Sequence, residues 1–283
     1  MNIIRQAEEL KEELKTIRNE QKAIGFVPTM GALHQGHLSL IEESKANTGV
    51  TVCSIFVNPA QFNDPKDYEK YPNTIDKDLQ ILRKAGTDIV YIPTVNEVYP
   101  EGTKDLEHYD LGYLETILEG HYRPGHFQGV SQVMSRLLRI VLPDQLFMGQ
   151  KDYQQCMVIQ KLLHLTQLDQ HISLQVCPTV RESDGLAMSS RNLRLNVQER
   201  KIAVGIIKAL EFAKREIVPG DLTRLEIEAT TLLAGSGFKV DYFEIAKADS
   251  LELINDWDGH TKLVALTAAF LNQVRLIDNM LLN

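Results

Sequence analysis

The sequence predicts an α/β protein: a parallel β-sheet with helices on both faces, followed by a smaller α+β domain. Strand-like and helix-like segments alternate from residue 23 to residue 176. Some strand-like segments, such as VTVCSIFV at residues 50–57, are apolar almost throughout, which is typical of strands buried on both faces. Beyond about residue 181 the alternation stops, and two helical segments precede a series of short strand-like ones.

Hydrophobic spacing and end signals place the elements of the first domain. Ala7, Leu10, Leu14 and Ile17 recur at helical spacing, so the chain opens with an amphipathic helix. Gly86 follows another helical segment and is a typical helix end. The predicted strands are residues 23–29, 50–57, 88–92, 145–148 and 172–176. The predicted helices between and after them are residues 38–46, 74–85, 127–141 and 152–166.

The second domain is predicted from a change in pattern after residues 178–183, where we place the boundary. Asn196, with Glu199 three positions later, has the signature of a capping box and predicts a helix start. A further helix is predicted from about residue 221 to 235, and antiparallel strands at residues 240–246, 263–270 and 274–277. We therefore expect one domain of residues 1–180 and a C-terminal domain of residues 181–283.

Composition narrows the class of protein. The chain has 283 residues and a net charge of −8, which argues against a nucleic-acid partner because such proteins usually carry a basic surplus. No signal-peptide pattern and no apolar run of the roughly 20 residues that a membrane span needs are found, so we expect a cytoplasmic protein with no membrane partner. Cys53, Cys156 and Cys177 lie in apolar runs without CxxC spacing, which predicts buried, reduced thiols.

The sequence PTMGALHQGH at residues 28–37 lies between a predicted strand and a predicted helix. Amide N–H groups and the positive end of the helix dipole make such a turn an anion site, and His34 and His37 add side-chain donors. The three-glycine dinucleotide fingerprint and the Walker loop are both missing here. The HxGH turn together with the distant MSSR sequence at residues 188–191 resembles the nucleotidyltransferase superfamily, whose members attack the α-phosphate of ATP. The first domain is thus predicted to be a Rossmann-like nucleotide-binding domain.

Two further loops are expected beside the HxGH turn. FVNP at residues 56–59 and GQKD at residues 149–152 each follow a predicted strand. In open parallel sheets, ligands bind at the carboxyl ends of the strands. We therefore expect all three loops to meet at one edge of the sheet.

Five sequences in order along the chain resemble the pantothenate synthetase family: PTMGALHQGH (28–37), FVNPAQF (56–62), RPGHF (123–127), GQKDYQQ (149–155) and MSSRN (188–192). The resemblance implies ATP-dependent condensation of pantoate with β-alanine, giving pantothenate, AMP and pyrophosphate through a pantoyl adenylate. It also implies ATP as a substrate with Mg²⁺, and a homodimer. Because Mg²⁺ would bind mainly through phosphate oxygens, no carboxylate cage is expected.

Attack of a carboxylate on a phosphate brings two anions together, so donors directed at the phosphates are the largest available catalytic contribution. The predicted catalytic residues are His34, His37, Lys151 and Arg191. A histidine beside a polyphosphate should favour its charged form and donate from both nitrogens. By resemblance, His37 takes the proton-donor role. The predicted ATP-binding residues are Met30, Gly31, Ala32, Leu33, His34, Gln35, Gly36, His37, Gly149, Gln150, Lys151, Asp152, Val180, Met188, Ser189, Ser190 and Arg191.

Gln61 and Gln155 are predicted to bind the acid substrate, because neutral amides bind a carboxylate and hydroxyls without adding a nucleophile. For each of them the alternative is a buried structural amide. Asn58 is predicted to belong to the same pantoate/β-alanine-binding site and to orient the Gln61 loop. Asp152 fits a ribose contact, a helix N-cap or both. Gln150 stands where the family usually has glutamate, which could alter Mg²⁺ or nucleotide affinity.

An acyl adenylate hydrolyses when water reaches it, so a lid is needed, and the C-terminal domain is predicted to be that lid. The loop of residues 123–127 is assigned no catalytic role; an active-site wall, a subunit contact and a simple turn remain open for it. Two other functions remain open at this point. One is transfer of AMP to a phosphate acceptor, against which the neutral Gln61 and Gln155 argue. The other is a nucleotide-sensing module that binds ATP without chemistry.

Overall fold

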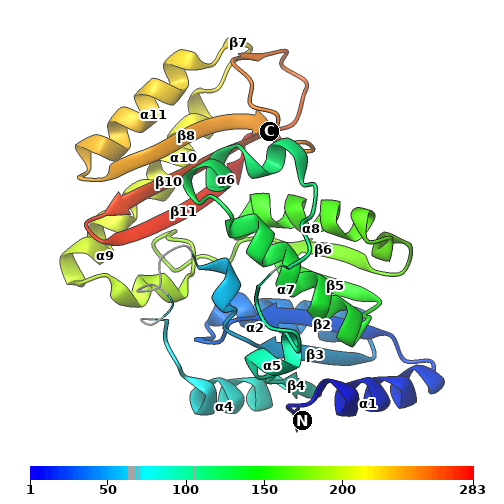
Figure 1. Ribbon diagram of the computed structural model, residues 1–283. Coiled ribbons are helices and arrows are strands. Elements are labelled where there is room, and N and C mark those ends of the chain that lie inside the picture. The colour runs from blue at the N-terminus through cyan, green and yellow to red at the C-terminus, as the bar shows by residue number, and fades with distance from the viewer. Residues whose placement is uncertain (63–67, 69–70, 105) are drawn as a thin grey trace. The chain divides into compact units, whose positions relative to one another are not determined.

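The computed structural model describes residues 1–62, 68, 71–104 and 106–283, and the chain divides into two compact units (Figure 1). The first unit contains Met1–Gly149 and Gln155–Cys177, and the second contains Gln150–Gln154 and Pro178–Asn283. The predicted ranges 1–180 and 181–283 differ from these units mainly at Gln150–Gln154, which belongs to the second unit although it lies far from it in sequence. That the C-terminal domain acts as a lid stays a prediction.

In the described part of the chain, six strands of the first unit form a sheet in the order β1-β4-β3-β2-β5-β6. Every neighbouring pair is parallel. The strands are β1 (Asn2–Ile4), β2 (Ile24–Thr29), β3 (Val50–Ile55), β4 (Ile89–Tyr91), β5 (Gln145–Gly149) and β6 (Ser173–Cys177). The predicted parallel sheet is confirmed. Strand β1 was not predicted, because three residues are too few to show a periodicity.

Two helices of the first unit, α1 and α2, contact strands of the sheet and also other helices. Helix α2 packs on β2, β3 and β5 and on α4, where Ile41 and Leu82 join a core with Val27 and Phe147 of the strands. Helix α1 packs against β1 and α7. The helices of this part of the chain are α1 (Ala7–Asn19), α2 (Gln35–Asn47), α4 (Ile75–Ala85), α5 (Val95–Val98), α6 (Leu118–Tyr122), α7 (His126–Val141) and α8 (Tyr153–Leu165). The 3₁₀ turns are η1 (Pro59–Gln61), η2 (Gly112–Glu115) and η4 (Leu168–Gln170).

Helix ends agree with the sequence signals in one case and differ in another. Gly86 adopts φ +76° at the end of α4, the left-handed conformation that glycine accepts at no steric cost. Helix α2 begins at Gln35 rather than at the predicted residue 38, because His34 caps it. As a result Gly36 and His37 lie in the first helical turn, and the turn proper is Met30–Leu33.

The second unit contains an antiparallel sheet in the order β11-β10-β8, coloured orange to red in Figure 1. Its helix α9 begins with the predicted capping box: Asn196 Oδ1 accepts from Glu199 N, and Glu199 Oε2 accepts from Asn196 N. Helix α10 was not predicted. The elements are η3 (Gln150–Asp152), η5 (Ser190–Arg194), α9 (Val197–Ala203), α10 (Gly205–Glu216), β7 (Gly220–Asp221), α11 (Thr223–Gly235), β8 (Lys239–Lys247), β9 (Asp256–Trp257), β10 (Leu263–Leu271) and β11 (Val274–Leu281).

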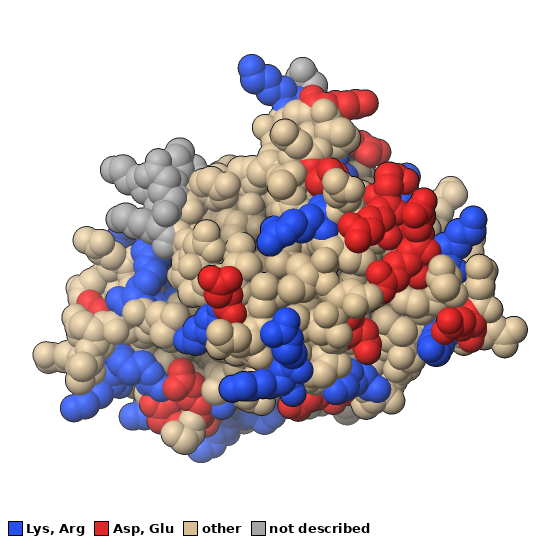
Figure 2. All heavy atoms as spheres, turned by 90° about the horizontal axis from the view of Figure 1, so that it is seen from below, with Lys and Arg blue, Asp and Glu red and all other residues tan. Residues whose placement is uncertain are grey.

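Membrane-spanning helices, cysteines and surface charge were each the subject of an expectation from the sequence. Among the described helices, none has the length and apolar character that crossing a membrane requires. Cys53, Cys156 and Cys177 are buried free thiols, as predicted. On the face shown in Figure 2, one large group of acidic side chains stands out, and smaller acidic groups are interspersed with basic side chains over the rest. That face therefore carries both signs of charge rather than a continuous basic surface.

Candidate active site

The turn after β2 is held by a buried carboxylate. Asp78 of α4 accepts hydrogen bonds from the backbone N–H groups of Ala32 (2.9 Å) and Leu33 (2.8 Å), and Thr74 donates to it through Oγ1 (2.9 Å). Gly31 and Ala32 have φ values of +82° and +51°, so the chain reverses sharply here. Two amide groups that were expected to face a phosphate are thus directed at Asp78, and their role is to set the shape of the turn.

His34 and His37 lie side by side at the start of α2, with ring centroids 4.1 Å apart and ring planes tilted by 40°. Gly36 N donates to His34 Nδ1 (3.1 Å), and His34 N donates to His37 Nδ1 (3.3 Å). A ring nitrogen that accepts a hydrogen bond carries no proton, so in this arrangement the proton of each neutral ring is on Nε2. In this geometry Nε2 is the donor atom that each ring offers. The charged form expected beside a polyphosphate, which would donate from both nitrogens, stays a prediction.

Asn58, Gln61 and Met30 come together at the end of β3. Asn58 is 1% exposed, and its Nδ2 donates to Gly129 O (3.1 Å) and Gln61 Oε1 (3.2 Å). Gln61 Nε2 donates to Met30 Sδ (2.9 Å). Tyr99 donates to Asn58 Oδ1 (2.8 Å), and burial raises the pKa of Tyr99 to about 12, so its hydroxyl stays a donor. Asn58 thus orients Gln61, as predicted from its position in the loop.

The loop of residues 123–127 also contacts Gln61. His126 is buried, with its Nδ1 3.0 Å from Gln61 O and its Nε2 3.0 Å from Arg123 Nη1. A guanidinium only donates, so Nε2 accepts and Nδ1 carries the proton that His126 donates to Gln61 O. Arg123 also pairs with Glu119 at 3.5 Å. The segment that was assigned no catalytic role therefore fixes the backbone of Gln61.

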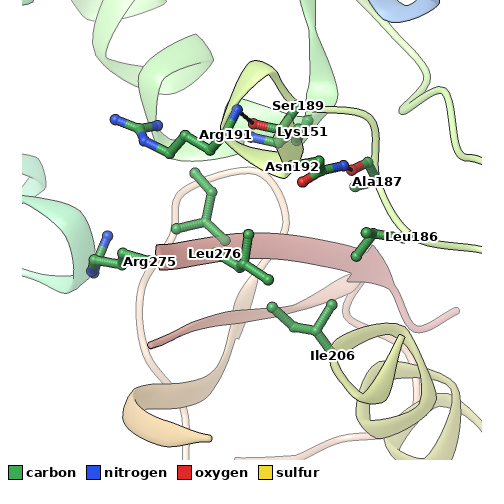
Figure 3. A pocket seen from close by; sticks show the side chains of 10 residues that line it. Lys151, Leu186, Ala187, Ser189, Arg191, Asn192, Ile206, Arg275 and Leu276 are labelled. Carbon is green, nitrogen blue, oxygen red and sulfur yellow. Dashed lines mark hydrogen bonds between the residues drawn. The ribbon is translucent and has the colours of Figure 1, made fainter. Parts of the chain in front are cut away.

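In the second unit, one pocket collects several predicted phosphate ligands (Figure 3). Lys151 reaches it from η3, and Ser189 and Arg191 from the start of η5. Ser189 Oγ accepts from Arg191 N (3.2 Å), which orients the turn and leaves the hydroxyl proton to donate elsewhere. The remaining lining residues are Leu186, Ala187, Asn192, Ile206, Arg275, Leu276 and Ile277. The pocket thus combines three cationic side chains, those of Lys151, Arg191 and Arg275, with an apolar wall.

The other predicted residues have the following positions. Met188 N donates to Val180 O (3.0 Å), so these two predicted nucleotide contacts are neighbours. Lys151 Nζ lies 3.4 Å from Asp152 Oδ1. Gln35 is exposed on α2, whereas Gly149, Gln150, Gln155 and Ser190 are half-buried. Within each unit, then, a distinct cluster of predicted residues forms, and the individual roles of these residues stay predictions.

Several positioning residues were not found from the sequence. Asp78 has a recognisable signal: it shares the buried face of α4 with Ile75 and Leu82, where a carboxylate is unusual. Gly129 has a weaker signal as a glycine within a helix. Tyr99 gave none, because its partner lies far away in the sequence. His126 was noticed only as part of the RPGHF motif, which did not reveal its contact with Gln61.

The fold and the arrangement of His34 and His37 define a class of protein. It is an α/β protein with a parallel sheet and a histidine-capped helix at the carboxyl end of an inner strand. Comparison with known proteins narrows this class. A family model described as pantoate-beta-alanine ligase matches residues 2–281. Pantothenate synthetase of Cytophaga hutchinsonii is 43% identical over 278 residues, covering 97% of each chain. That of Phocaeicola vulgatus is 42% identical over 284 residues, covering 99% of each. The chain belongs to the pantoate–β-alanine ligase family.

Solved structures agree with this assignment. Pantothenate synthetase from Thermus thermophilus has a TM-score of 0.89 and 35% identity, over 99% of both chains. Pantoate-beta-alanine ligase from Francisella tularensis, complexed with beta-gamma ATP and β-alanine, has a TM-score of 0.82 and 38% identity, over 99% of this chain and 97% of that one.

Proposed function

We propose that this chain ligates pantoate and β-alanine at the expense of ATP, forming pantothenate, AMP and pyrophosphate. The structural observation that carries the proposal is the pair of Nε2 donors of His34 and His37 at the start of α2. Membership of the ligase family supports it, as does the solved relative with beta-gamma ATP and β-alanine bound. Both histidines follow an inner strand of a parallel sheet, where such sheets bind ligands.

The reaction has two steps. In the first, a carboxylate oxygen of pantoate attacks the α-phosphorus of ATP, and the bond between the α-phosphorus and the bridging oxygen breaks, which releases pyrophosphate. In the second, the amine nitrogen of β-alanine attacks the acyl carbon, AMP leaves, and the amine loses a proton. Negative charge gathers on the phosphates in the first step, and the Nε2–H groups of His34 and His37 stabilise it. His37 is also assigned the proton-donor role.

Lys151 and Arg191 are assigned to the phosphates. Lys151 supplies a compact charge and Arg191 a planar pair of donors, and both line one pocket of the second unit with Ser189. Ser190, Val180 and Met188 complete the nucleotide contacts, together with Gly149, Gln150 and Asp152.

Gln61 and Gln155 are assigned to pantoate, with Asn58 holding Gln61. The contact of Gln61 with Met30 places an apolar atom beside an amide donor, which suits an acid that bears both methyl and hydroxyl groups. A neutral amide in this position binds the carboxylate without competing for the electrophile.

Mg²⁺ fits the site through ATP rather than through protein ligands. Within the described ranges, no group of three or more His, Cys, Asp or Glu side chains could hold a metal ion. Mg²⁺ characteristically keeps waters and binds substrate phosphates, so it would neutralise phosphate charge there. A homodimer, a cytoplasmic location and a lid formed by residues 181–283 complete the proposal.

Exchange of labelled pyrophosphate into ATP, with Mg²⁺ and pantoate present and β-alanine omitted, tests the first step. We expect exchange that requires pantoate and is lost in His37→Ala. If exchange is absent, AMP release on adding β-alanine would show that both acids must bind before the first step. Absence of AMP as well would contradict ligation and favour a nucleotide-binding module, whereas AMP transfer to a phosphate acceptor would favour an adenylyltransferase.

Gln61→Ala tests the substrate assignment in the same assay. We expect its KM for pantoate to rise while its KM for ATP stays close to that of the unmodified enzyme. Unchanged turnover of pantoate would remove Gln61 from the substrate site.

A further inference from the structure

Asn279, near the end of β11, is bonded to the segment that carries Lys151. Its side chain is buried, with 2% of the residue exposed. Its Nδ2 donates to the carbonyl oxygens of Gln150 (2.9 Å) and Lys151 (2.9 Å), and its Oδ1 accepts from Gln150 Nε2 (3.3 Å). All these residues belong to the second unit. One amide group therefore makes three hydrogen bonds to two consecutive residues.

Asn279 is itself fixed by its neighbour. Asp278 Oδ1 accepts from Asn279 N (2.8 Å), and the Asp278 side chain is fully buried. Arg181 binds Asp278 through two hydrogen bonds of 2.6 and 3.0 Å, and it donates to Asn279 O at 3.3 Å. A buried charge pair of this kind is strongly directional. The Asn279 amide is thus a rigid anchor rather than an adaptable side chain.

Lys151 needs such an anchor because of its own flexibility. A lysine ammonium is a point charge on a flexible four-carbon stem, so its backbone must be fixed for the charge to reach one place. The backbone here is a single 3₁₀ turn of three residues, η3, which has poor intrinsic hydrogen-bond geometry. Fixing the carbonyl of Lys151 and that of the preceding residue defines where the side chain starts.

We propose that Asn279 is a positioning residue that places Lys151 for the ATP phosphates. This inference rests on the proposed function, in which Lys151 binds those phosphates. Asn279 acts through the backbone of Lys151 and touches no substrate.

The side-chain amide of Gln150 supplies the donor that the oxygen of the Asn279 amide needs. This neutral amide donates to Asn279 Oδ1 while both protons of Asn279 Nδ2 are used on carbonyl oxygens. A glutamate at this position could only accept, and its carboxylate would face the Asn279 oxygen. A neutral amide at position 150 therefore completes the anchor.

The test is a double-mutant cycle on the full chain, with Asn279→Leu, Lys151→Ala and the double variant. We expect Asn279→Leu to lower kcat/KM for ATP by about tenfold to a hundredfold, since a misplaced catalytic group costs this much. In the Lys151→Ala background the same substitution should change kcat/KM by no more than about twofold. Equal fold-losses in both backgrounds, or no loss with Lys151 present, would overturn the proposal.

Two further variants separate positioning from folding. Thr267 lies on β10, the strand next to β11, and its fully buried hydroxyl donates to Tyr242 O of β8, a hydrogen bond that Thr267→Val removes. This substitution should lower Tm without a selective effect on ATP. If Asn279→Leu does not fold, Gln150→Ala replaces it: this change removes the bond to Asn279 Oδ1, and the loss of any direct nucleotide contact of Gln150 would persist in Lys151→Ala. A several-fold loss in ATP affinity that disappears in Lys151→Ala would support the proposal, and a loss that persists there would refute it.

The unmodified enzyme is assayed first, so that the two proposals fail separately. Absence of ligation in that protein would refute the proposed function. The Asn279 inference would then be decided by ATP affinity, measured by calorimetry on the same four proteins, with the same non-additive pattern expected.

Discussion

Asp78 accepts a hydrogen bond from the backbone N–H of Leu33 at 2.8 Å, and so joins helix α4 to the turn that precedes His34. The same carboxylate binds the neighbouring N–H of Ala32, a residue with φ +51°. A non-glycine residue in this conformation needs support from its surroundings. The turn that directs His34 and His37 is therefore maintained by a side chain that belongs to another element.

Asp78→Asn should destabilise the fold and impair catalysis. Asparagine keeps one acceptor but presents an NH₂ group to a backbone N–H, which leaves a buried donor unpaired. We expect a loss of about 2 kcal/mol in unfolding free energy and a clear fall in kcat, measured by denaturant titration and by the ligation assay. Asp76→Asn is the control, because Asp76 is exposed on the same helix and should change neither quantity. A fully active, fully stable Asp78→Asn enzyme would contradict this account of the turn.

His34 should have separable structural and chemical roles. Its Nδ1 caps α2, and its Nε2 is proposed to donate to the phosphates. Asparagine is among the best N-cap residues but does not reach as far, so His34→Asn should retain Tm while kcat falls by about 10²–10³. His34→Ala should lose both. Thermal denaturation and initial rates distinguish these outcomes, and equal activity of the asparagine variant and the unmodified enzyme would exclude a role for Nε2.

Gly129 allows α7 to approach η1. A Cβ atom at this position would lie 2.2 Å from Ala60 O, and both groups belong to backbone that cannot move aside alone. Gly129→Ala should therefore cost about 2 kcal/mol or more and raise the KM for pantoate, because Asn58 and Gln61 would shift. Gly235→Ala, where nothing lies within 4 Å, is the control and should be neutral or slightly stabilising. Similar melting temperatures for both variants would contradict the packing described here.

Glu226 should make the stability of the protein depend on pH. Burial raises its pKa from 4.5 to about 7, although the N–H of Ile245 partly opposes this. A raised pKa in the folded state means that folding favours the protonated form. Its stabilising contribution is complete below the unfolded pKa of 4.5 and is lost as the pH rises through about 7.

The isosteric variant Glu226→Gln isolates this effect, because its amide oxygen still accepts from Ile245 N. Relative to the variant, the unmodified protein should lose about 1 kcal/mol of unfolding free energy over this pH range, a value discounted for the partial exposure of the side chain. Denaturant titrations at pH values on either side of the range measure it. Parallel pH profiles for the two proteins would show that Glu226 does not titrate in this way.

Local signals predicted the fold well. Apolar runs identified the inner strands β2 and β3, and Asn196 with Glu199 identified the start of α9, because each signal lies within a few residues of its consequence. The break that separates α9 from α10 had no such signal.

Among the candidate site residues, the motifs named the side chains but not what holds them. Asp78 lies 46 positions from Ala32, and Asn279 lies 129 positions from Gln150. Such pairings depend on the packed arrangement of several elements, which periodicity does not specify. The backbone hydrogen bonds of His34 and His37 were not predicted, for the same reason. Charge considerations favoured the imidazolium, whereas the backbone N–H groups that reach each Nδ1 can be seen only in the structure.

Gln150–Gln154 belongs to the second unit although the segments before and after it belong to the first. This arrangement restricts where the chain can be cut into fragments or recombined with a relative. A fragment that begins at Pro178 would contain Asn279 but not the carbonyl groups that this residue binds. Recombination between relatives at a single point near residue 178 would likewise combine an anchor from one parent with a lysine segment from the other. Residues 150 and 279 should therefore be exchanged together, and chimaeras that separate them should be impaired even when each half comes from a functional parent.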